Sequence, residues 1–290
     1  MSPPTRPSAA GAAGAAGPAG PAVLAIGGSD PSCGAGIQSD IRTLEWFGVM
    51  PLTVITSITV QDGARVNRVE PLEPGLVLDQ LDTLLAASKP AVIKCGMLAT
   101  PPIVESIAAR IERLHTERFP EDGTAYRPPL VVDPVAQAGG GETLGGRDVL
   151  QAIARSLLPL AEVVTCNAIE AGLLVDGTVE TPEHGEAAAR HIRQLGPRAV
   201  VVKGGHFTGE PVDILVDASG CHRFEGERIA GPSMHGTGCA FASAVAAGLA
   251  QGRSMQFAVA DARAHVRALI ADADRRDGAR VLRRPPNLSR

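Results

Sequence analysis

The sequence has few aromatic residues and no excess of positive charge. Phenylalanine, tryptophan and tyrosine together make up only 3% of the 290 residues. A chain with so few aromatic rings lacks the stacking platforms that proteins use to bind single-stranded nucleic acid. The net charge is −4 at pH 7, so no basic surplus would attract a phosphate backbone or an anionic lipid surface. We therefore expect neither nucleic acid nor a membrane as a partner.

The cysteines form no pattern typical of a metal site or a disulfide framework. There are five of them, widely scattered, with no CxxC pair and no Cys/His spacing that suits zinc. Long apolar runs are also missing, because the longest one, Cys239–Ala250, is too short and too rich in small residues to span a bilayer. Free thiols and the lack of a secretion-signal pattern predict a protein of the reducing cytoplasm.

The two ends of the chain differ in composition from the middle. Residues 1–21 are mostly Ala, Gly, Pro and Ser, whereas residues 277–290 are polar and basic and contain two adjacent prolines. Segments of this kind bury too little apolar surface to fold, so we expect both to be irregular tails. No linker or internal repeat divides residues 22–276, which we expect to form a single domain.

The middle of the chain alternates between short apolar runs and helical patterns. The runs predict buried strands at Val23–Ile26, Leu52–Ile55, Ala91–Lys94, Leu130–Val132, Val163–Thr165 and Ala199–Val202. The helical patterns are Ile37–Phe47, Gly75–Ala87, Ile103–His115, Arg147–Leu157, Glu183–Leu195, Cys239–Ala250 and Met255–Ala273. This alternation predicts a three-layer α/β/α fold with a mostly parallel central sheet. The turn Asp62-Gly63 and the stretch Asp213–Phe224 predict antiparallel hairpins at an edge of that sheet.

Two glycine-rich turns stand where a predicted strand leads into a helix. The first covers Gly27–Gly36 and fits neither the P-loop nor the dinucleotide-binding pattern, and the second covers Ser233–Cys239. Consecutive amides at a helix N-terminus, made pliable by Gly236 and Gly238, form an anion site. The plain alternatives are a simple turn for the first and a capped buried helix for the second.

Cys239 follows Gly236-Thr237-Gly238 in the first turn of the helix after the second loop. A thiol at a helix N-terminus has its thiolate form favoured by the helix dipole. This position predicts a base, or a polarising partner, for a substrate hydroxyl. The alternative is a small core residue, since free cysteine is among the residues most often buried.

Polar residues follow three other predicted strands. Asp133, Asn167 and Glu170 could converge on one Mg²⁺ ion or its waters, because hard oxygen ligands suit that ion. Lys203 ends a buried strand and could meet a phosphate group. Each has a structural alternative: Asp133 would cap a turn, Glu170 would lie on a solvated helix face, and Lys203 would extend its ammonium to the surface.

Taken in order, these segments resemble the hydroxymethylpyrimidine/phosphomethylpyrimidine kinases of thiamine biosynthesis, in the ribokinase superfamily. The resemblance runs from about Ala22 to Ala273. Its seven blocks are Gly27–Gln38, Val54–Gln61, Lys94–Leu98, Val132–Val135, Asn167–Ala171, Lys203–His206 and His235–Cys239. It implies a ribokinase-like fold and a kinase that uses ATP and Mg²⁺ to phosphorylate 4-amino-5-hydroxymethyl-2-methylpyrimidine and then its monophosphate. A homodimer is also expected.

The resemblance assigns the blocks to parts of one site. The pyrimidine pocket would be lined by Gly28, Ala35, Asp40, Gln61 and Met97. The anion hole and catalytic group would come from Gly236, Thr237, Gly238 and Cys239. ATP would be contacted by Asn167, Lys203 and Thr237, and Mg²⁺ by Asp133 and Glu170. Gln61 would meet the amino and nitrogen edge of the ring, since an amide supplies both a donor and an acceptor.

Other functions remain open. Pyridoxal kinases share the same loops, but Gln61 favours a pyrimidine, since relatives directed at vitamin B6 tend to carry other residues there. A non-catalytic ligand-binding protein on the same scaffold would have no need of a phosphoryl cradle such as Gly236–Cys239. A sugar kinase of the superfamily would carry Asp at position 239. The chain also departs from the family at Cys33, where the first loop usually has glycine.

Overall fold

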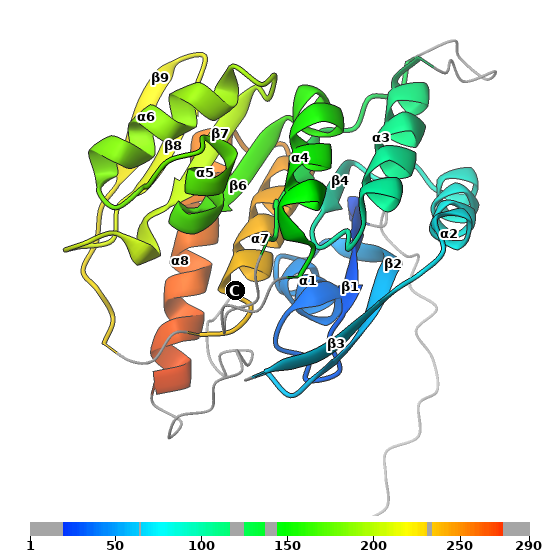
Figure 1. The fold of residues 1–290 in the computed structure, drawn as a ribbon, viewed down its shortest axis with the longest axis horizontal. Coiled ribbons are helices and arrows are strands. Elements are labelled where there is room, and N and C mark those ends of the chain that lie inside the picture. The colour runs from blue at the N-terminus through cyan, green and yellow to red at the C-terminus, as the bar shows by residue number, and fades with distance from the viewer. Residues whose placement is uncertain (1–19, 64, 117–124, 137–143, 231–233, 275–290) are drawn as a thin grey trace, which may run out of the picture.

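The structure, a computed structural model, describes residues 20–63, 65–116, 125–136, 144–230 and 234–274. Within these residues one mixed sheet runs through the molecule, with helices on both faces (Figure 1). The strand order is β3-β2-β1-β4-β5-β6-β7-β8-β9. Apart from Gly20 and Pro21, the two predicted tails lie outside the described residues.

The sheet contains each strand that the sequence predicts. The strands are β1 (Ala22–Ser29), β2 (Met50–Gln61), β3 (Val66–Pro71), β4 (Val92–Cys95), β5 (Leu130–Val132), β6 (Val163–Asn167), β7 (Ala199–Lys203), β8 (Asp213–Asp217) and β9 (Gly220–Phe224). The central pairs, from β2 through β1 and β4 to β7, are all parallel. Strand β3 pairs antiparallel with β2 at one edge, and β8 and β9 are antiparallel at the other. Both predicted hairpins are confirmed, and they occupy opposite edges.

The helices match the predicted periodicity, with one addition. They are α1 (Gly36–Trp46), α2 (Pro74–Ala87), α3 (Pro101–Thr116), α4 (Gly146–Ser156), α5 (Ala168–Leu174), α6 (Pro182–Arg193), α7 (Thr237–Ala250) and α8 (Met255–Asp274). Two short 3₁₀ turns occupy Leu158–Leu160 and Gly204–His206. The sequence did not predict α5, which is too short to show a helical period. None of the described helices combines the length and the apolar character needed to cross a membrane.

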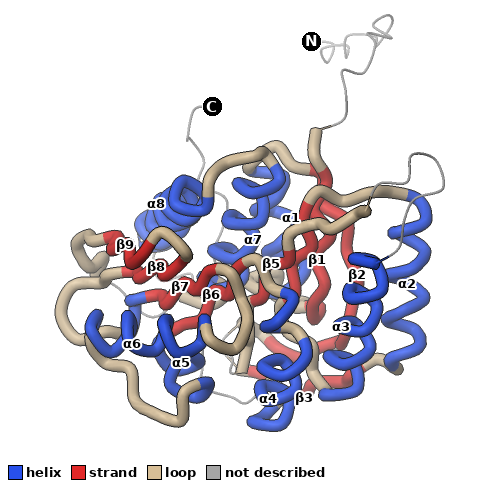
Figure 2. Tube along the Cα trace, turned by 90° about the horizontal axis from the view of Figure 1, so that it is seen from above, coloured by secondary structure: helices blue, strands red, loops and turns tan. Residues whose placement is uncertain are grey.

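The strands are apolar throughout because both faces of the sheet are covered. Helices α1, α7 and α8 lie on one face, and α2 to α6 lie on the other (Figure 2). Neighbouring residues of a strand point to opposite faces. Val23 and Ala25 of β1 therefore pack with α1 and α7, while Leu24 and Ile26 pack with the opposite helices. This arrangement brings the carboxyl ends of the parallel strands to one edge, where such folds bind ligands.

Candidate functional site

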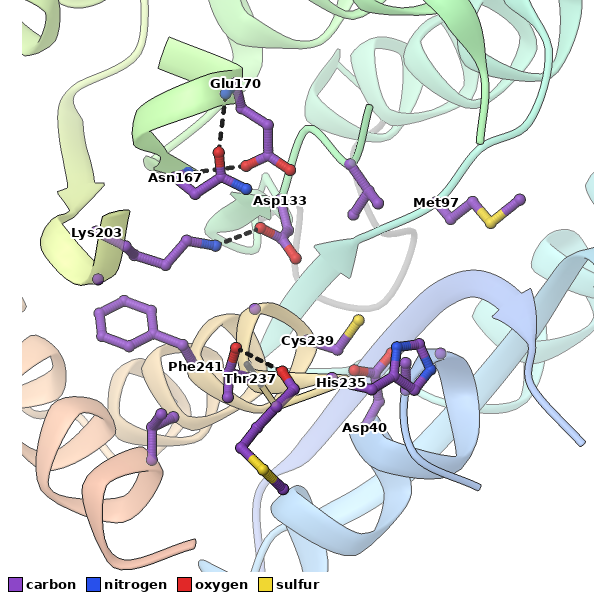
Figure 3. Close-up of a pocket in the computed structure, with 18 of the residues that line it drawn as sticks. Asp40, Met97, Asp133, Asn167, Glu170, Lys203, His235, Thr237, Cys239 and Phe241 are labelled. Atoms are coloured by element: carbon purple, nitrogen blue, oxygen red, sulfur yellow. Dashed lines mark hydrogen bonds and ion pairs between the residues drawn. The ribbon is translucent and has the colours of Figure 1, made fainter. Parts of the chain in front are cut away.

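A cavity of about 580 Å³ lies at the carboxyl ends of the parallel strands. It is lined by every residue that the sequence nominated, namely Gly28, Ala35, Asp40, Gln61, Met97, Asp133, Asn167, Glu170, Lys203, Gly236, Thr237, Gly238 and Cys239. Ten of the lining side chains are labelled in Figure 3, where Lys203 and Asp133 lie to one side of Cys239 and Met97 to the other. Segments more than 200 residues apart in the chain thus share one pocket.

The second glycine loop caps helix α7. Gly236 occupies the N-cap position with a φ of 87°, in the left-handed region that favours glycine. A Cβ atom there would lie only 1.9 Å from the carbonyl oxygen of Gly34 in the first loop. Any other residue at position 236 would therefore push the two glycine loops apart. The amides of Thr237, Gly238 and Cys239 open the helix beside the cavity, as an anion site requires.

The first glycine loop is organised by Asp30, which the sequence did not single out. The Asp30 carboxylate accepts hydrogen bonds from the backbone amides of Ser32, Gly34 and Ala35, at 2.8, 3.1 and 2.8 Å. The chain's own carboxylate therefore takes the amides of this loop. Cys33 in this loop has a φ of 60°, in the left-handed region that glycine adopts more readily than other residues.

Asp30 also joins the two glycine loops. His235 Nε2 lies 3.1 Å from Asp30 Oδ2, although the two residues are 205 positions apart. Burial alone would raise the pKa of Asp30, but the hydrogen bonds from His235, Ser32 and Ala35 outweigh it and lower the pKa to about 2. The carboxylate is therefore ionised at neutral pH and holds both loops in register.

Asp40 lies beneath this loop contact, lines the cavity and is paired with other side chains of the protein. Its oxygens accept hydrogen bonds from Lys94 Nζ at 2.9 Å and from Ser243 Oγ at 2.8 Å, and the side chain has no exposed surface. The sequence predicted Asp40 as a substrate contact, whereas the structure pairs it with Lys94. Burial would lower the pKa of Lys94, but the Asp40 carboxylate raises it, so the ammonium stays charged close to Cys239.

The predicted phosphate and metal residues gather at the ends of β5, β6 and β7. Lys203 Nζ lies 3.0 Å from Asp133 Oδ1, and Thr165 Oγ1 lies 3.4 Å from the same oxygen (Figure 3). The Lys203 side chain is 14% exposed, so it does not extend to the surface. Asp133 Oδ2 and Lys203 Nζ both face the backbone of Gly238, since a Cβ there would lie 3.6 and 3.3 Å from them.

Glu170 and Asn167 form a capping box at the start of α5. Asn167 Oδ1 accepts a hydrogen bond from the Glu170 amide at 2.9 Å, and Glu170 Oε2 accepts one from the Asn167 amide at 2.8 Å. Glu170 is buried, so the alternative of a solvated helix face is wrong. Burial raises the pKa of Glu170 to about 7, with Asp133 raising it further and Lys203 opposing.

The Cys239 thiol is half-buried beside the anion loop. Burial raises its pKa to about 11, although the Lys94 ammonium acts in the opposite direction. The sequence argument predicted that the helix dipole would favour the thiolate. In the free protein the pKa is raised instead, because burial and the nearby Asp40 and Asp133 carboxylates outweigh the Lys94 ammonium.

The part of the cavity where the sequence predicts the pyrimidine pocket is narrow beside Gly28 and Met97. A Cβ on Gly28 would lie 2.8 Å from Ser57 Oγ and 3.2 Å from Met97 Sδ, so only glycine leaves room here. Gln61 lines the same end, from the last position of β2. Together with Ala35, these residues form the part of the predicted pyrimidine pocket whose surface lines the cavity.

Several residues of the site escaped the sequence argument. Further lining residues of the cavity are apolar side chains and three arginines, namely Ile229, Phe241, Val266, Ile270, Arg228, Arg263 and Arg267. They come from α7, α8 and a connecting loop and form no local motif, so no sequence signal pointed to them. The capping box of Asn167 and Glu170 does have a local signal in the sequence, because an Asn followed three residues later by Glu is typical of a helix start.

Comparison with known proteins agrees with this geometry. The sequence pattern of the family described as phosphomethylpyrimidine kinase matches residues 30–280. The thiamine biosynthesis bifunctional protein ThiED of Geobacter sulfurreducens is 39% identical over 86% of this chain, which spans only 49% of that protein. The hydroxymethylpyrimidine/phosphomethylpyrimidine kinase of Rhizobium meliloti is 37% identical, over 87% of this chain and 91% of that one.

Solved structures give the same picture. The phosphomethylpyrimidine kinase of Clostridium difficile superposes with a TM-score of 0.73 at 31% identity, covering 85% of this chain and 98% of its own. The pyridoxal kinase of Staphylococcus aureus, in complex with AMP-PCP and pyridoxal, superposes with a TM-score of 0.76 at 32% identity. That match covers 87% of this chain and 88% of the other. Together with the family pattern, these likenesses show that the chain belongs to the phosphomethylpyrimidine kinase family, with the ribokinase-like fold.

Proposed function

We propose that this protein transfers the γ-phosphate of ATP to the hydroxymethyl group of 4-amino-5-hydroxymethyl-2-methylpyrimidine, and then to the resulting monophosphate. One observation carries the proposal. A single cavity holds a pocket with Met97 and the Gln61 amide on one side of the anion loop and Cys239, and the cluster of Lys203 and the buried carboxylates on the other side. Family membership supports the same reaction.

The two ends of the cavity suit the two substrates. Gln61, Met97 and Gly28 offer a narrow slot with one bidentate amide, which fits a small polar ring. The apolar side chains of Phe241, Val266 and Ile270 in the cavity wall suit the larger purine of ATP. Asn167 and Lys203 lie between, where the phosphates of ATP would pass. The hydroxymethyl group would then reach the γ-phosphate beside Cys239.

Phosphoryl transfer needs positioning and charge neutralisation more than covalent chemistry. The amides of Gly236–Cys239 would hold the transferred group, and the Lys203 ammonium would balance its charge. Cys239 would receive the hydroxyl proton. Because its pKa is about 11 in the free protein, only a small fraction is thiolate at pH 7, so this role predicts a rate that rises with pH.

Mg²⁺ fits the residues present. The ion commonly binds through one or two carboxylates together with waters and substrate phosphates. Asp133 Oδ2 faces the anion loop, while Oδ1 is held by Lys203. Glu170 is a second buried carboxylate in the same cluster. No set of three metal-binding side chains occurs among the described residues, which suits an ion held mainly through phosphates. When bound, Mg²⁺ would neutralise phosphate charge.

Pyridoxal is the second candidate substrate. The likeness to pyridoxal kinases of known structure, at 32% identity, favours it. The two candidates differ at the ring edge that Gln61 would meet. Turnover of both alcohols by the purified protein, with ATP and Mg²⁺, separates them: we expect ADP release to be faster with the pyrimidine. Faster turnover of pyridoxal would assign the site to the second candidate.

We also propose a homodimer as the assembly. Ile58 and Val60 lie two residues apart on β2 and are 44% and 52% exposed, and neighbouring exposed apolar side chains favour contact with a second copy. Sedimentation equilibrium of the purified chain tests this, and a monomer at all micromolar concentrations would contradict it.

A further inference from the structure

Thr59 and Gln61 lie two residues apart on β2 and both line the cavity. Residues two apart on a strand point to the same side. Thr59 is only 4% exposed, whereas its neighbours Ile58 and Val60 point the other way and are 44% and 52% exposed. The Thr59 hydroxyl is therefore buried in the cavity wall, next to the amide that would read the substrate ring.

The hydrogen bonds of Thr59 restrict how it can contact Gln61. Its hydroxyl donates to the backbone carbonyl oxygen of Ser29 at 2.8 Å. Gln61 Nε2 lies 2.7 Å from the same hydroxyl oxygen. A hydroxyl has one proton and two lone pairs, and a carbonyl oxygen can only accept. The Thr59 hydroxyl is therefore an acceptor toward Gln61, so the amide must turn its NH₂ group, and not its oxygen, toward Thr59.

This orientation determines what Gln61 offers to the cavity. One N–H of the NH₂ group is used by Thr59, and the second remains. Within the described part of the chain, no hydrogen bond to Gln61 Oε1 is formed. The amide thus offers the cavity its oxygen as an acceptor and its second N–H as a donor. It complements a ring edge with an amino donor beside an unprotonated ring nitrogen, and it opposes an edge with an oxo group beside a ring N–H.

We propose that Thr59 is a specificity-determining positioning residue, which selects a 4-aminopyrimidine over a 4-oxopyrimidine by fixing the Gln61 amide. The inference rests on the proposed function, because it places the pyrimidine ring against Gln61. The Ser29 carbonyl that accepts from Thr59 is in a segment that Gln38 holds in place. Gln38 Nε2 donates to Ser29 Oγ at 2.9 Å, and Gln38 Oε1 accepts from the Asp30 amide at 2.9 Å. The first glycine loop thereby supports the choice of ring.

The test compares two substrates that differ only at the ring edge: 4-amino-5-hydroxymethyl-2-methylpyrimidine and its 4-oxo analogue. In the wild-type full chain, kcat/KM should favour the amino compound by about tenfold or more, as expected for one mispaired buried edge. Thr59→Val removes the hydroxyl at similar size, so the amide can turn over. We expect the preference to fall below about threefold, through the KM for the pyrimidine, with the KM for ATP unchanged.

Two further variants separate positioning from a general structural effect. Thr59→Ser keeps the hydroxyl and should retain the wild-type preference. In a Gln61→Leu background, Thr59→Val should change the preference no further, because the amide that it positions is gone. Thermal denaturation reports whether each variant folds. If the Thr59→Val protein does not fold, Thr59→Ala takes its place in the comparison.

The possible failures are distinguishable. A Thr59→Val enzyme that keeps the wild-type preference for the amino compound would overturn this inference and leave the proposed function intact. A Thr59→Ser enzyme that loses the preference would do the same. A wild-type enzyme that phosphorylates neither pyrimidine would overturn the proposed function, and the inference with it.

Discussion

The protonation state of Cys239 gives a quantitative prediction. With a pKa of about 11, roughly one molecule in 10⁴ carries the thiolate at pH 7, against roughly 3% for an ordinary thiol of pKa about 8.5. A more basic thiolate is intrinsically more nucleophilic, which recovers about tenfold of this roughly 300-fold deficit. Cys239 should therefore react with iodoacetamide about 20- to 30-fold more slowly than an unhindered free thiol, and partial burial slows it further.

The assay follows alkylation of the Cys239 peptide by mass spectrometry from pH 7 to pH 10. The rate should rise nearly tenfold for each pH unit without a plateau, and bound pyrimidine should protect the thiol. If the thiolate accepts the substrate proton, kcat/KM should rise over the same range, and Cys239→Ala should lower kcat by roughly 10²–10⁴-fold. An alkylation rate that levels off near pH 7 would refute the assigned pKa. An alanine variant with wild-type kcat would leave the backbone amides as the functional part of the loop.

Three other predictions concern separate parts of the molecule. Gln61→Leu should weaken binding of the pyrimidine by about 1–3 kcal/mol, which raises the KM for the pyrimidine and leaves the KM for ATP unchanged. An unchanged KM for the pyrimidine would show that Gln61 does not touch the ring. Lys94→Met leaves the Asp40 carboxylate buried without its cation and should lower the free energy of unfolding in urea by about 3–5 kcal/mol, most of it restored by adding Asp40→Leu. A loss below about 1 kcal/mol would contradict the pairing. Burial lowers the pKa of His265 from 6.5 to about 4 in the folded protein. As the pH falls, the unfolded chain therefore takes up the proton before the folded protein does. The free energy of unfolding should decrease between about pH 6.5 and about pH 4, by up to about 3 kcal/mol. His265→Leu should remove that share of the pH dependence, and identical pH profiles for the two proteins would refute it.

The sequence was informative wherever one segment carries its own signal. Apolar runs such as Val23–Ile26 and Ala199–Val202 predicted strands because both faces of the sheet are buried. The turn Asp62-Gly63 predicted the β2–β3 hairpin for the same local reason. The residues that the resemblance nominated line one cavity because strand ends and glycine turns converge at one edge of a parallel sheet.

The sequence was uninformative about pairings between distant segments. Nothing near Asp40 indicates that Lys94, 54 positions away, fills its carboxylate. The contact of Asp30 with His235 is equally remote. The pKa of Cys239 was mispredicted for a related reason, since the dipole is visible from the local sequence while burial depends on the whole fold.

The most direct test of the central claim is a coupled assay of ADP release by the purified full chain. With ATP, Mg²⁺ and 4-amino-5-hydroxymethyl-2-methylpyrimidine, we predict steady turnover that EDTA abolishes and that exceeds the turnover of pyridoxal under the same conditions. Mass spectrometry of the product should show one added phosphoryl group, and then a second. Turnover of pyridoxal alone, or of neither alcohol, would contradict the proposed function.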